Sequence, residues 1–408
     1  MTKTKTRLIV CTLALMACAA LLAACGGVSP REQAMSTELA ALQTKVARPP
    51  ATAAPATVAP TATVAPTPTP DALAARIDEY IRGQTAFSGV IFVAQKGKVL
   101  FSQGYGMANR ELDVPNTPQT KFAIGSMTKA FTALAIMILQ ERGKLSVQDP
   151  LCNYIKDCPA AWKAITLHHL LTHTSGVHDF TVSPVIEKIN FCQQYKPEEV
   201  IAYFKDLPLD FTPGKGWSYS NSGYFLLGMV IEKASDESYE NFIQENILQP
   251  LGMTESGYDR ASTIVKNRAS GYTIDEDKVQ FVNASCSDVS LMYAAGGLYS
   301  TVEDLYKWDQ ALYTDQLVSK ETLNTIFTST VFVTPGGVAT DSEYGYGWVI
   351  SQLSGHRVIW HNGRVFGFGS ILLRYPDDQA TVIVLSNFDT LDTDSIGNAV
   401  AGMALGTK

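Results

Sequence analysis

The hydrophobic positions of residues 71–408 follow a strand-like pattern near both ends and a helical pattern in between. Two short apolar runs, 90–94 and 99–103, flank the turn-forming pair Lys96-Gly97 and predict a β-hairpin. From about residue 120 to near 330 the spacing is largely helical. Strand patterns then return, and we expect further strands at 346–352, 357–361, 370–375 and 381–386.

Helical patterns also begin and end this part of the chain. We expect helices at 72–81, capped by Asp71, and at 128–142, 224–234 and 394–405. Strands from both ends with helices between them favour an α+β fold, in which an antiparallel sheet is built from both chain ends and flanked by helices. Because the segment exceeds the size at which one core stops growing, we expect a mainly helical lobe inserted in its middle.

The first 24 residues have the pattern of a secretory leader. Three basic residues precede an apolar run at 8–24, and Cys25 follows Leu22-Ala23-Ala24. This ending resembles a bacterial lipobox, so we expect cleavage to leave Cys25 as a lipid-modified N-terminus. An uncleaved signal anchor is the alternative. Either way, we expect an exported protein that is held on the outer side of a membrane.

A linker separates the leader from the folded part. Residues 49–70 contain only Pro, Ala, Thr and Val, a composition that favours an extended polyproline II spacer. We therefore divide the chain into a lipoprotein signal peptide at 1–24, a lipid-bearing linker at 25–70 and a folded domain at 71–408.

Charge and cysteine content narrow the function classes. The formal net charge of −7 provides no basic footprint for nucleic acid. In an oxidising compartment Cys152 and Cys158, which bracket a short loop, are expected to form a disulfide. Cys192 and Cys286 are either a second pair or two buried free thiols.

The tetrad Ser126-Met127-Thr128-Lys129 is the first candidate for chemistry. If a helix begins here, residues three apart share a face, which places an amine within reach of a hydroxyl. A lysine kept partly neutral by burial can take the proton of that hydroxyl and activate it as a nucleophile. Alone the motif is weak, because a helix cap followed by a solvated lysine gives the same pattern.

Two later segments strengthen this interpretation. Tyr219 and Asn221 lie two residues apart just before a predicted helix, a spacing that aims both side chains at one point. A tyrosine near a cation can lose its proton well below its usual pKa and act as a general base. Further on, His361 and Arg364 lie on or beside a strand, and Gly363 between them would let a substrate backbone approach closely.

In the order S-x-x-K, Y-x-N and H-x-G, these motifs resemble those of the serine β-lactamase and penicillin-binding protein superfamily. The resemblance is to its branch of class C β-lactamases, D-alanyl-D-alanine carboxypeptidases and related esterases. It covers essentially all of 71–408 and includes the runs 165–176, 295–301 and 367–370. It implies the β-lactamase/transpeptidase-like fold.

The resemblance also implies residue roles. Ser126 would be the acylated nucleophile, Lys129 and Tyr219 would move its proton, and Asn221 would bind the acyl amide of the substrate. His361 and Gly363 would lie in the substrate site, with His361 where β-lactamases usually carry a lysine. The backbone N–H groups of Ser126 and Arg364 would form the oxyanion hole. Arg364 departs from the small or hydroxylated residue usual at its position, and its side chain either grips a substrate carboxylate or points to solvent.

The implied activity is hydrolysis through an acyl-enzyme of D-alanyl peptides, β-lactams or small esters, without a cofactor or metal. The partners would be a small-molecule or peptide substrate, including cell-wall peptide, and we expect a monomer. His361 favours peptidase or esterase activity over an efficient β-lactamase. The alternative is a slowly acylating or non-catalytic penicillin-binding envelope protein that acts as a sensor or scaffold.

Four of the six histidines fall within a short segment: His168, His169, His173 and His178. His169 and His173 have a spacing able to chelate zinc on a helix, but no H-E-x-x-H motif or matching carboxylate accompanies them. We therefore expect a structural role for this segment, beside the cleft.

Overall fold

The computed structural model describes residues 70–407, apart from 85, 183, 276–279, 329–330 and 333–341. The predicted leader, Cys25 and the linker up to residue 69 lie outside the described residues. Pro70 already belongs to the first described helix, α3 (Pro70–Gly83), so Asp71 is not its cap as predicted. Proline is favoured in a first helical turn because its fixed φ suits the helix and its missing N–H would have no partner there.

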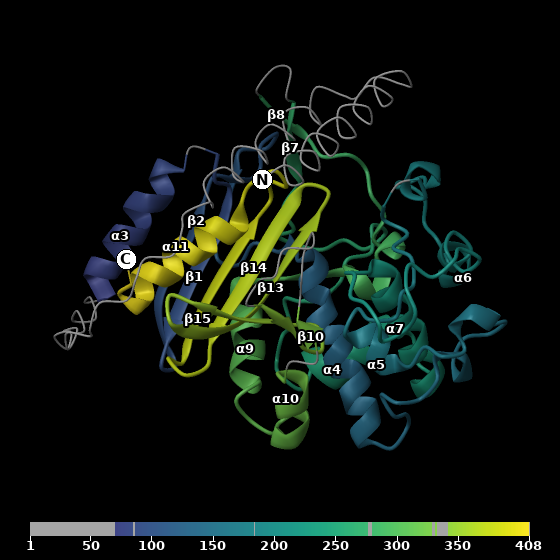
Figure 1. The fold of residues 1–408 in the computed structure, drawn as a ribbon. Coiled ribbons are helices and arrows are strands. Elements are labelled where there is room, and N and C mark those ends of the chain that lie inside the picture. The colour runs from purple at the N-terminus through teal and green to yellow at the C-terminus, as the bar shows by residue number, and fades with distance from the viewer. Residues whose placement is uncertain are drawn as a thin grey trace, which may run out of the picture. The chain divides into compact units, whose positions relative to one another are not determined.

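An eight-stranded antiparallel sheet forms the centre of the domain, and the two chain ends meet within it (Figure 1). The strand order is β10-β11-β12-β13-β14-β15-β1-β2, and Gly89 of β1 pairs with Ser386 of β15. The strands are β1 (Gly89–Gln95), β2 (Lys98–Tyr105), β10 (Val331–Phe332), β11 (Glu343–Tyr344), β12 (Val349–Leu353), β13 (His356–Val365), β14 (Phe368–Tyr375) and β15 (Ala380–Ser386). The predicted hairpin and the sheet assembled from both ends are confirmed.

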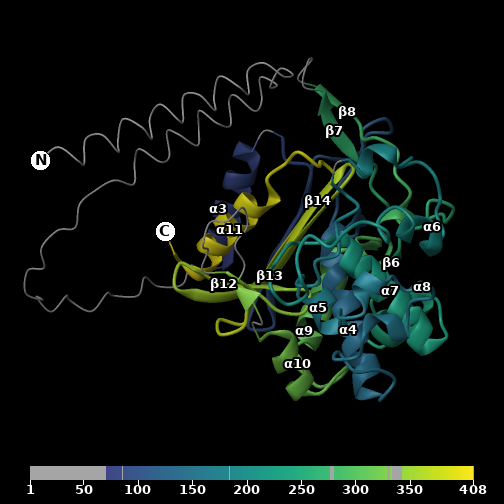
Figure 2. The ribbon, with the colours of Figure 1, turned by 45° about the vertical axis from the view of Figure 1, so that its right-hand side comes forward.

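Helices cover both faces of the sheet (Figures 1 and 2). Because side chains alternate along a strand, β1 sends Ile91 and Val93 to one core and Phe92 to the other. The first core is closed by α3 and α11 (Thr393–Leu405). The second core contains α4 (Thr128–Glu141) and α9 (Val302–Ala311), where Phe131 stacks on Trp308 with ring centroids 3.8 Å apart.

The inserted lobe is less helical than the hydrophobic spacing predicts. Its α-helices are α5 (Leu167–Leu171), α6 (Pro197–Ile201), α7 (Asn221–Ser235), α8 (Tyr239–Ile243) and, nearer the sheet, α10 (Lys320–Ile326). Single turns add η1 (Gly125–Met127), η2 (Leu151–Asn153), η3 (Ala160–Trp162), η4 (Ile186–Lys188), η5 (Gln244–Leu248), η6 (Val289–Leu291) and η7 (Tyr293–Ala295). Short strands form small sheets: β3 (Met107–Asn109) with β4 (Val114–Pro115), β5 (Phe122–Ala123) with β9 (Leu298–Ser300) and β6 (Gly257–Tyr258), and β7 (Tyr272–Asp275) with β8 (Gln280–Asn283). Short apolar runs do not distinguish these elements from helices by period alone.

The strand predicted at 346–352 begins later than expected, because β12 starts only at Val349. The chain leaves the sheet after β11 and returns at β12, with Gly347 between them at φ +76°. A Cβ on Gly347 would lie 2.8 Å from the carbonyl oxygen of Lys129, so the glycine allows this turn to pack against the start of α4. The β11–β12 connection therefore lies next to Lys129, a residue of the candidate site.

Both cysteine pairs form disulfides. Cys152 and Cys158 are bonded as predicted, and Cys192 is bonded to Cys286 across 94 residues of sequence. The second bond resolves the alternative left open by the sequence, and it ties the loop before α6 to the segment that follows β8.

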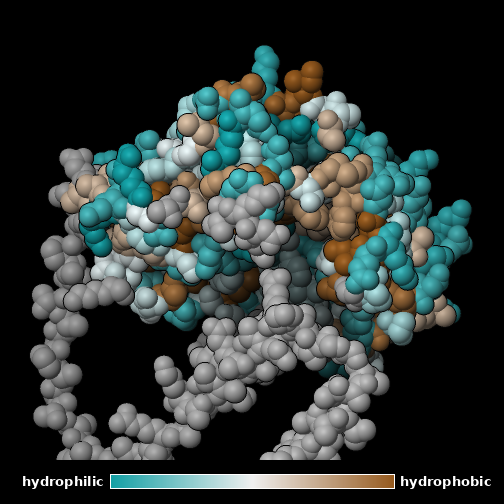
Figure 3. Space-filling model, turned by 90° about the horizontal axis from the view of Figure 1, so that it is seen from above, coloured by the Kyte–Doolittle hydropathy of each residue, from teal (hydrophilic) through white to brown (hydrophobic). Residues whose placement is uncertain are grey.

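The described surface is largely hydrophilic. In the view of Figure 3, hydrophobic side chains form separate patches among hydrophilic ones. Exposed large hydrophobic residues include Leu112, Ile264 and Phe366. Within the described ranges, no helix is both long and apolar enough to cross a membrane.

Candidate active site

Ser126 and Lys129 lie on either side of the boundary between two consecutive elements. Ser126 is in the 3₁₀ turn η1, and Lys129 is in the first turn of α4. Residues three apart eclipse one another in a 3₁₀ turn, so the change of element preserves the predicted juxtaposition. Lys129 Nζ donates a hydrogen bond to Ser126 Oγ over 3.0 Å.

Lys129 is fully buried, and all its hydrogen-bond donors have partners. Besides Ser126 Oγ, its Nζ bonds to Asn221 Oδ1 and to the carbonyl oxygen of Ala295, each at 2.8 Å. Burial lowers the pKa of Lys129 to about 7, while the carboxylate of Asp179 acts in the opposite direction. Near neutral pH the amine is therefore present in both protonation states, and its neutral form is able to accept a proton from Ser126.

Tyr219 approaches the same two residues from the loop before α7. Lys129 Nζ lies 4.8 Å from the centre of its ring, and its hydroxyl is hydrogen-bonded to the Ser126 side chain. The expected lowering of its pKa is wrong, because burial raises the pKa of Tyr219 and outweighs the Ser126 hydrogen bond, which lowers it. The tyrosine therefore enters the site as a neutral phenol that can pass a proton on, and Lys129 is the better base.

Asn221, the first residue of α7, is held by three protein groups. Its Oδ1 accepts from Lys129, and its Nδ2 donates to Asp179 Oδ2 at 3.2 Å and to Thr181 Oγ1 at 3.0 Å. The resemblance implied that this amide binds the substrate, but both of its hydrogens point to protein groups and not to an open substrate position. In this structure Asn221 orients Lys129, and a substrate amide would have to replace Asp179 or Thr181 as its partner.

His361 faces the site from β13 as a buried, neutral imidazole. Its Nδ1 lies 2.6 Å from the carbonyl oxygen of Asn362, which can only accept, so Nδ1 carries the proton. Its Nε2 then accepts from the Tyr344 hydroxyl at 3.1 Å. Burial and the neighbouring Lys129 lower the pKa of His361 to about 3. The position therefore offers no positive charge near neutral pH.

Gly363 is required by contact with the protein's own backbone. A Cβ on Gly363 would collide with the carbonyl oxygen of Ile124 and lie 2.9 Å from the Ser126 nitrogen. A Cβ on Gly125 would lie 2.8 Å from the Arg364 nitrogen. The two glycines thus bring the backbones of η1 and β13 together, which places the two nitrogens of the predicted oxyanion hole in adjoining segments.

The Arg364 side chain lies on the surface. Its Nη2 donates to the carbonyl oxygen of Leu391 at 3.2 Å, and the residue is exposed. Of the two alternatives, the structure favours the side chain that points to solvent, here fastened to the segment before α11.

The histidine segment has structural partners. His168 Nδ1 pairs with the Tyr346 hydroxyl at 2.8 Å, His169 caps α5, and His178 pairs with Asp210. His173 is buried at φ +59°, and its Nδ1 accepts from the Ser220 nitrogen at 3.0 Å. Its ring centroid lies 4.4 Å from that of Tyr219.

His173 therefore supports the loop that carries Tyr219. This contact agrees with the structural role beside the cleft that the sequence predicts for the histidine segment. Asp179, Thr181 and Tyr344 also contact the site residues, but they were not predicted from the sequence, because none of them belongs to one of the three motifs.

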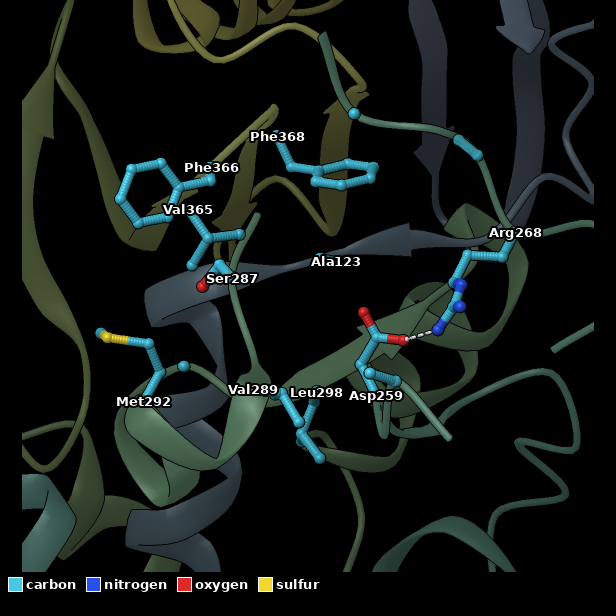
Figure 4. A pocket seen from close by; sticks show the side chains of 14 residues that line it. Ala123, Asp259, Arg268, Ser287, Val289, Met292, Leu298, Val365, Phe366 and Phe368 are labelled. Carbon is cyan, nitrogen blue, oxygen red and sulfur yellow. Dashed lines mark hydrogen bonds and ion pairs between the residues drawn. The ribbon is translucent and has the colours of Figure 1, made fainter. Parts of the chain in front are cut away.

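A cavity of about 200 Å³ has Ala123 and Val365 in its lining, and these two residues lie close in sequence to Ser126 and Arg364 (Figure 4). Apolar side chains form most of its labelled wall, and Asp259 and Arg268 form an ion pair at one end, with Oδ1 and Nη1 2.6 Å apart. We call this cavity the side pocket.

Known proteins are similar to this domain in both sequence and fold. Residues 73–404 match the model of the Beta-lactamase family. A penicillin-binding protein of Bacillus subtilis (strain 168) is 31% identical over 320 residues, which cover 74% of this chain and 68% of that protein.

Two solved structures agree. The penicillin-binding protein from Bacillus halodurans has a TM-score of 0.72 and 30% identity, and the match covers 80% of this chain and 98% of that chain. The octameric penicillin-binding protein homologue from Pyrococcus abyssi has a TM-score of 0.73 and 32% identity, over 82% and 78% of the two chains. The expected fold and superfamily are confirmed, and the chain belongs to the beta-lactamase family of serine hydrolases.

Proposed function

We propose that the protein hydrolyses acyl compounds outside the cytoplasm through an acyl-enzyme formed on Ser126. One observation carries this proposal: a fully buried amine, Lys129, with its pKa lowered to about 7, lies 3.0 Å from the hydroxyl of Ser126. A general base works best when its pKa is close to the working pH. A lysine in a merely structural role would not need this pairing with a hydroxyl.

The reaction would follow from the hydrogen bonds around Ser126. Neutral Lys129 takes the hydroxyl proton while Oγ forms a bond to the substrate carbonyl carbon. The N–H groups of Ser126 and Arg364 stabilise the oxyanion, at about 3 kcal/mol each. The phenol of Tyr219 then passes a proton to the departing amine or alcohol as its bond to carbon breaks, and Lys129 returns a proton to Tyr219. Water attacks the ester in a second, equivalent cycle.

The substrates would be D-alanyl peptides, β-lactams or small esters. The relatives named as penicillin-binding proteins support this range. Neutral His361, in the place where β-lactamases usually carry a lysine, would attract a substrate carboxylate less strongly, which supports peptide or ester substrates over efficient β-lactam hydrolysis.

We also propose that the protein is exported and anchored by a lipid on Cys25. The two disulfides of the domain support an oxidising compartment. Incorporation of labelled fatty acid by the wild type, and its loss in Cys25→Ala, would support the anchor. Equal labelling of both proteins would exclude it.

Acylation and turnover can be tested separately. A fluorescent penicillin or a fluorophosphonate should add its mass to Ser126, and Ser126→Ala should remove the label. Rates on a chromogenic cephalosporin, a short-chain nitrophenyl ester and an acyl-D-Ala-D-Ala peptide would then rank the substrates. Labelling of Ser126 without turnover of any of them would instead favour the sensor or scaffold, and absence of labelling would refute the nucleophile.

A further inference from the structure

We propose that the side pocket binds the side chain of the acyl group attached to Ser126, and that it selects an aliphatic chain that ends in a primary ammonium group. This inference rests on the proposed function, because it assumes that Ser126 carries the acyl group. It assigns a substrate class to that site from residues that the mechanism does not use.

The side pocket is next to the reacting groups. Three of its lining residues continue directly into the site: Ala123 precedes η1, Gly296 follows the Ala295 carbonyl that binds Lys129, and Val365 follows Arg364. A Cβ on Gly296 would lie 3.7 Å from the carbonyl carbon of Gly125. An acyl group on Ser126 therefore has the side pocket as its immediate neighbour.

The walls suit a methylene chain. Val289, Met292, Val365 and Phe368 line the side pocket and are only partly buried, so each leaves apolar surface facing the space (Figure 4). Covering that surface with an aliphatic chain would remove apolar area from water on both partners.

The pocket is fixed in width on one side. Phe366, which is 40% exposed, packs edge-on against Phe191 with ring centroids 5.0 Å apart. Phe191 is held in turn by the Cys192–Cys286 disulfide beside it and by a hydrogen bond of 2.7 Å from the Asp288 nitrogen to its carbonyl oxygen. This wall cannot easily widen, which favours an unbranched chain over a bulky one.

The polar end calls for a hydrogen-bond donor. Asp259 Oδ1 accepts from Arg268, and the backbone nitrogen of Asp259 is fastened to the carbonyl oxygen of Gly297 at 2.9 Å. Its other oxygen, Oδ2, points away from Arg268 into the cavity (Figure 4), and in the described part of the chain it accepts no hydrogen bond. An ammonium group would satisfy this oxygen and add a second positive charge to the carboxylate, whereas a carboxylate tip would meet it with like charge.

The test uses nitrophenyl esters whose acyl chains have the same length and end in an ammonium, a methyl or a carboxylate group. The wild type should show the highest kcat/KM with the ammonium ester and the lowest with the carboxylate ester. Asp259→Asn should reduce the preference for ammonium over methyl by about tenfold or more, because a hydrogen bond to a charged group is lost. Hydrolysis of the short acetyl ester, which does not reach the pocket, should stay unchanged.

Glu255→Gln is the matched control, since Glu255 is a half-exposed carboxylate that pairs with Lys121 and does not line the side pocket. It should keep the wild-type preference. Equal rates of the wild type on all three esters, or an unchanged preference in Asp259→Asn, would overturn the proposal. Turnover of the acetyl ester and labelling of Ser126 would in that case still support the proposed function, so the two failures are distinguishable. A preference for the carboxylate ester would also overturn it and point to Arg268 as the recognising group.

Discussion

The carboxylate of Asp179 and the amine of Lys129 lie at opposite ends of the Asn221 amide. Asn221 Oδ1 accepts from Lys129 at 2.8 Å, and its Nδ2 donates to Asp179 at 3.2 Å. The carboxylate of Asp179 therefore holds the Asn221 amide in place. Its negative charge also raises the pKa of Lys129, although burial lowers that pKa by more. Asp179 thus helps to keep that pKa near 7 instead of lower.

Replacing Asp179 should shift the pH dependence of acylation. Because Lys129 must be neutral to act as a base, the rate rises with pH through the pKa of its ammonium form. Asp179→Asn removes the charge that raises this pKa, so the rising limb should move to lower pH. Asp210→Asn, which alters a carboxylate paired with His178, is the control. The pH profile of kcat/KM measures both variants, and a limb that stays in place or moves to higher pH would show that Asp179 does not act on Lys129.

Removing the Tyr219 hydroxyl should slow the reaction without moving that limb. The raised pKa of Tyr219 keeps it a neutral phenol, so it relays a proton without titrating near neutral pH. Tyr219→Phe should reduce kcat by about 10²–10⁴-fold. A normal thermal unfolding curve would show that the fold is intact. If the limb moved together with the loss of rate, Tyr219 would have to be the titrating base.

A methyl group on Gly363 should separate β13 from η1. The new Cβ would collide with the carbonyl oxygen of Ile124 and lie 2.9 Å from the Ser126 nitrogen. Gly363→Ala should therefore lower the free energy of unfolding by about 1–3 kcal/mol and abolish acylation. Gly83→Ala is the control, because no atom lies within 4 Å of its added Cβ. Denaturant unfolding measures the effect, and wild-type stability with full activity would contradict the close approach.

The sequence predicted those parts of the site that lie in short motifs. The three-residue spacing of Ser126 and Lys129 is a local property, and it survived the change from a helix to a 3₁₀ turn. Asp179 and Thr181 could not be found in this way, because they are 42 and 40 residues away from Asn221 in the sequence.

Electrostatics and long-range contacts were the other features that the sequence alone could not determine. The direction of the Tyr219 pKa depends on burial outweighing its polar neighbours, and burial is a property of the folded domain. The turn at Gly347, which delays the start of β12 to Val349, likewise packs against α4 in a way that no periodicity encodes. The Cys192–Cys286 bond joins residues whose proximity only the fold creates.

The central claim is that neutral Lys129 activates Ser126, and the pH dependence of Ser126 acylation tests it most directly. The rate of mass addition at Ser126 by a fluorophosphonate or a penicillin would be followed by intact-protein and peptide mass spectrometry, with Lys129→Met as the reference variant. We predict that the wild-type rate rises through a pKa of about 7 and then levels off, and that Lys129→Met is folded but acylates orders of magnitude more slowly. A rate that continues to rise toward the ordinary lysine value of 10.5, or equal rates in the two proteins, would contradict it.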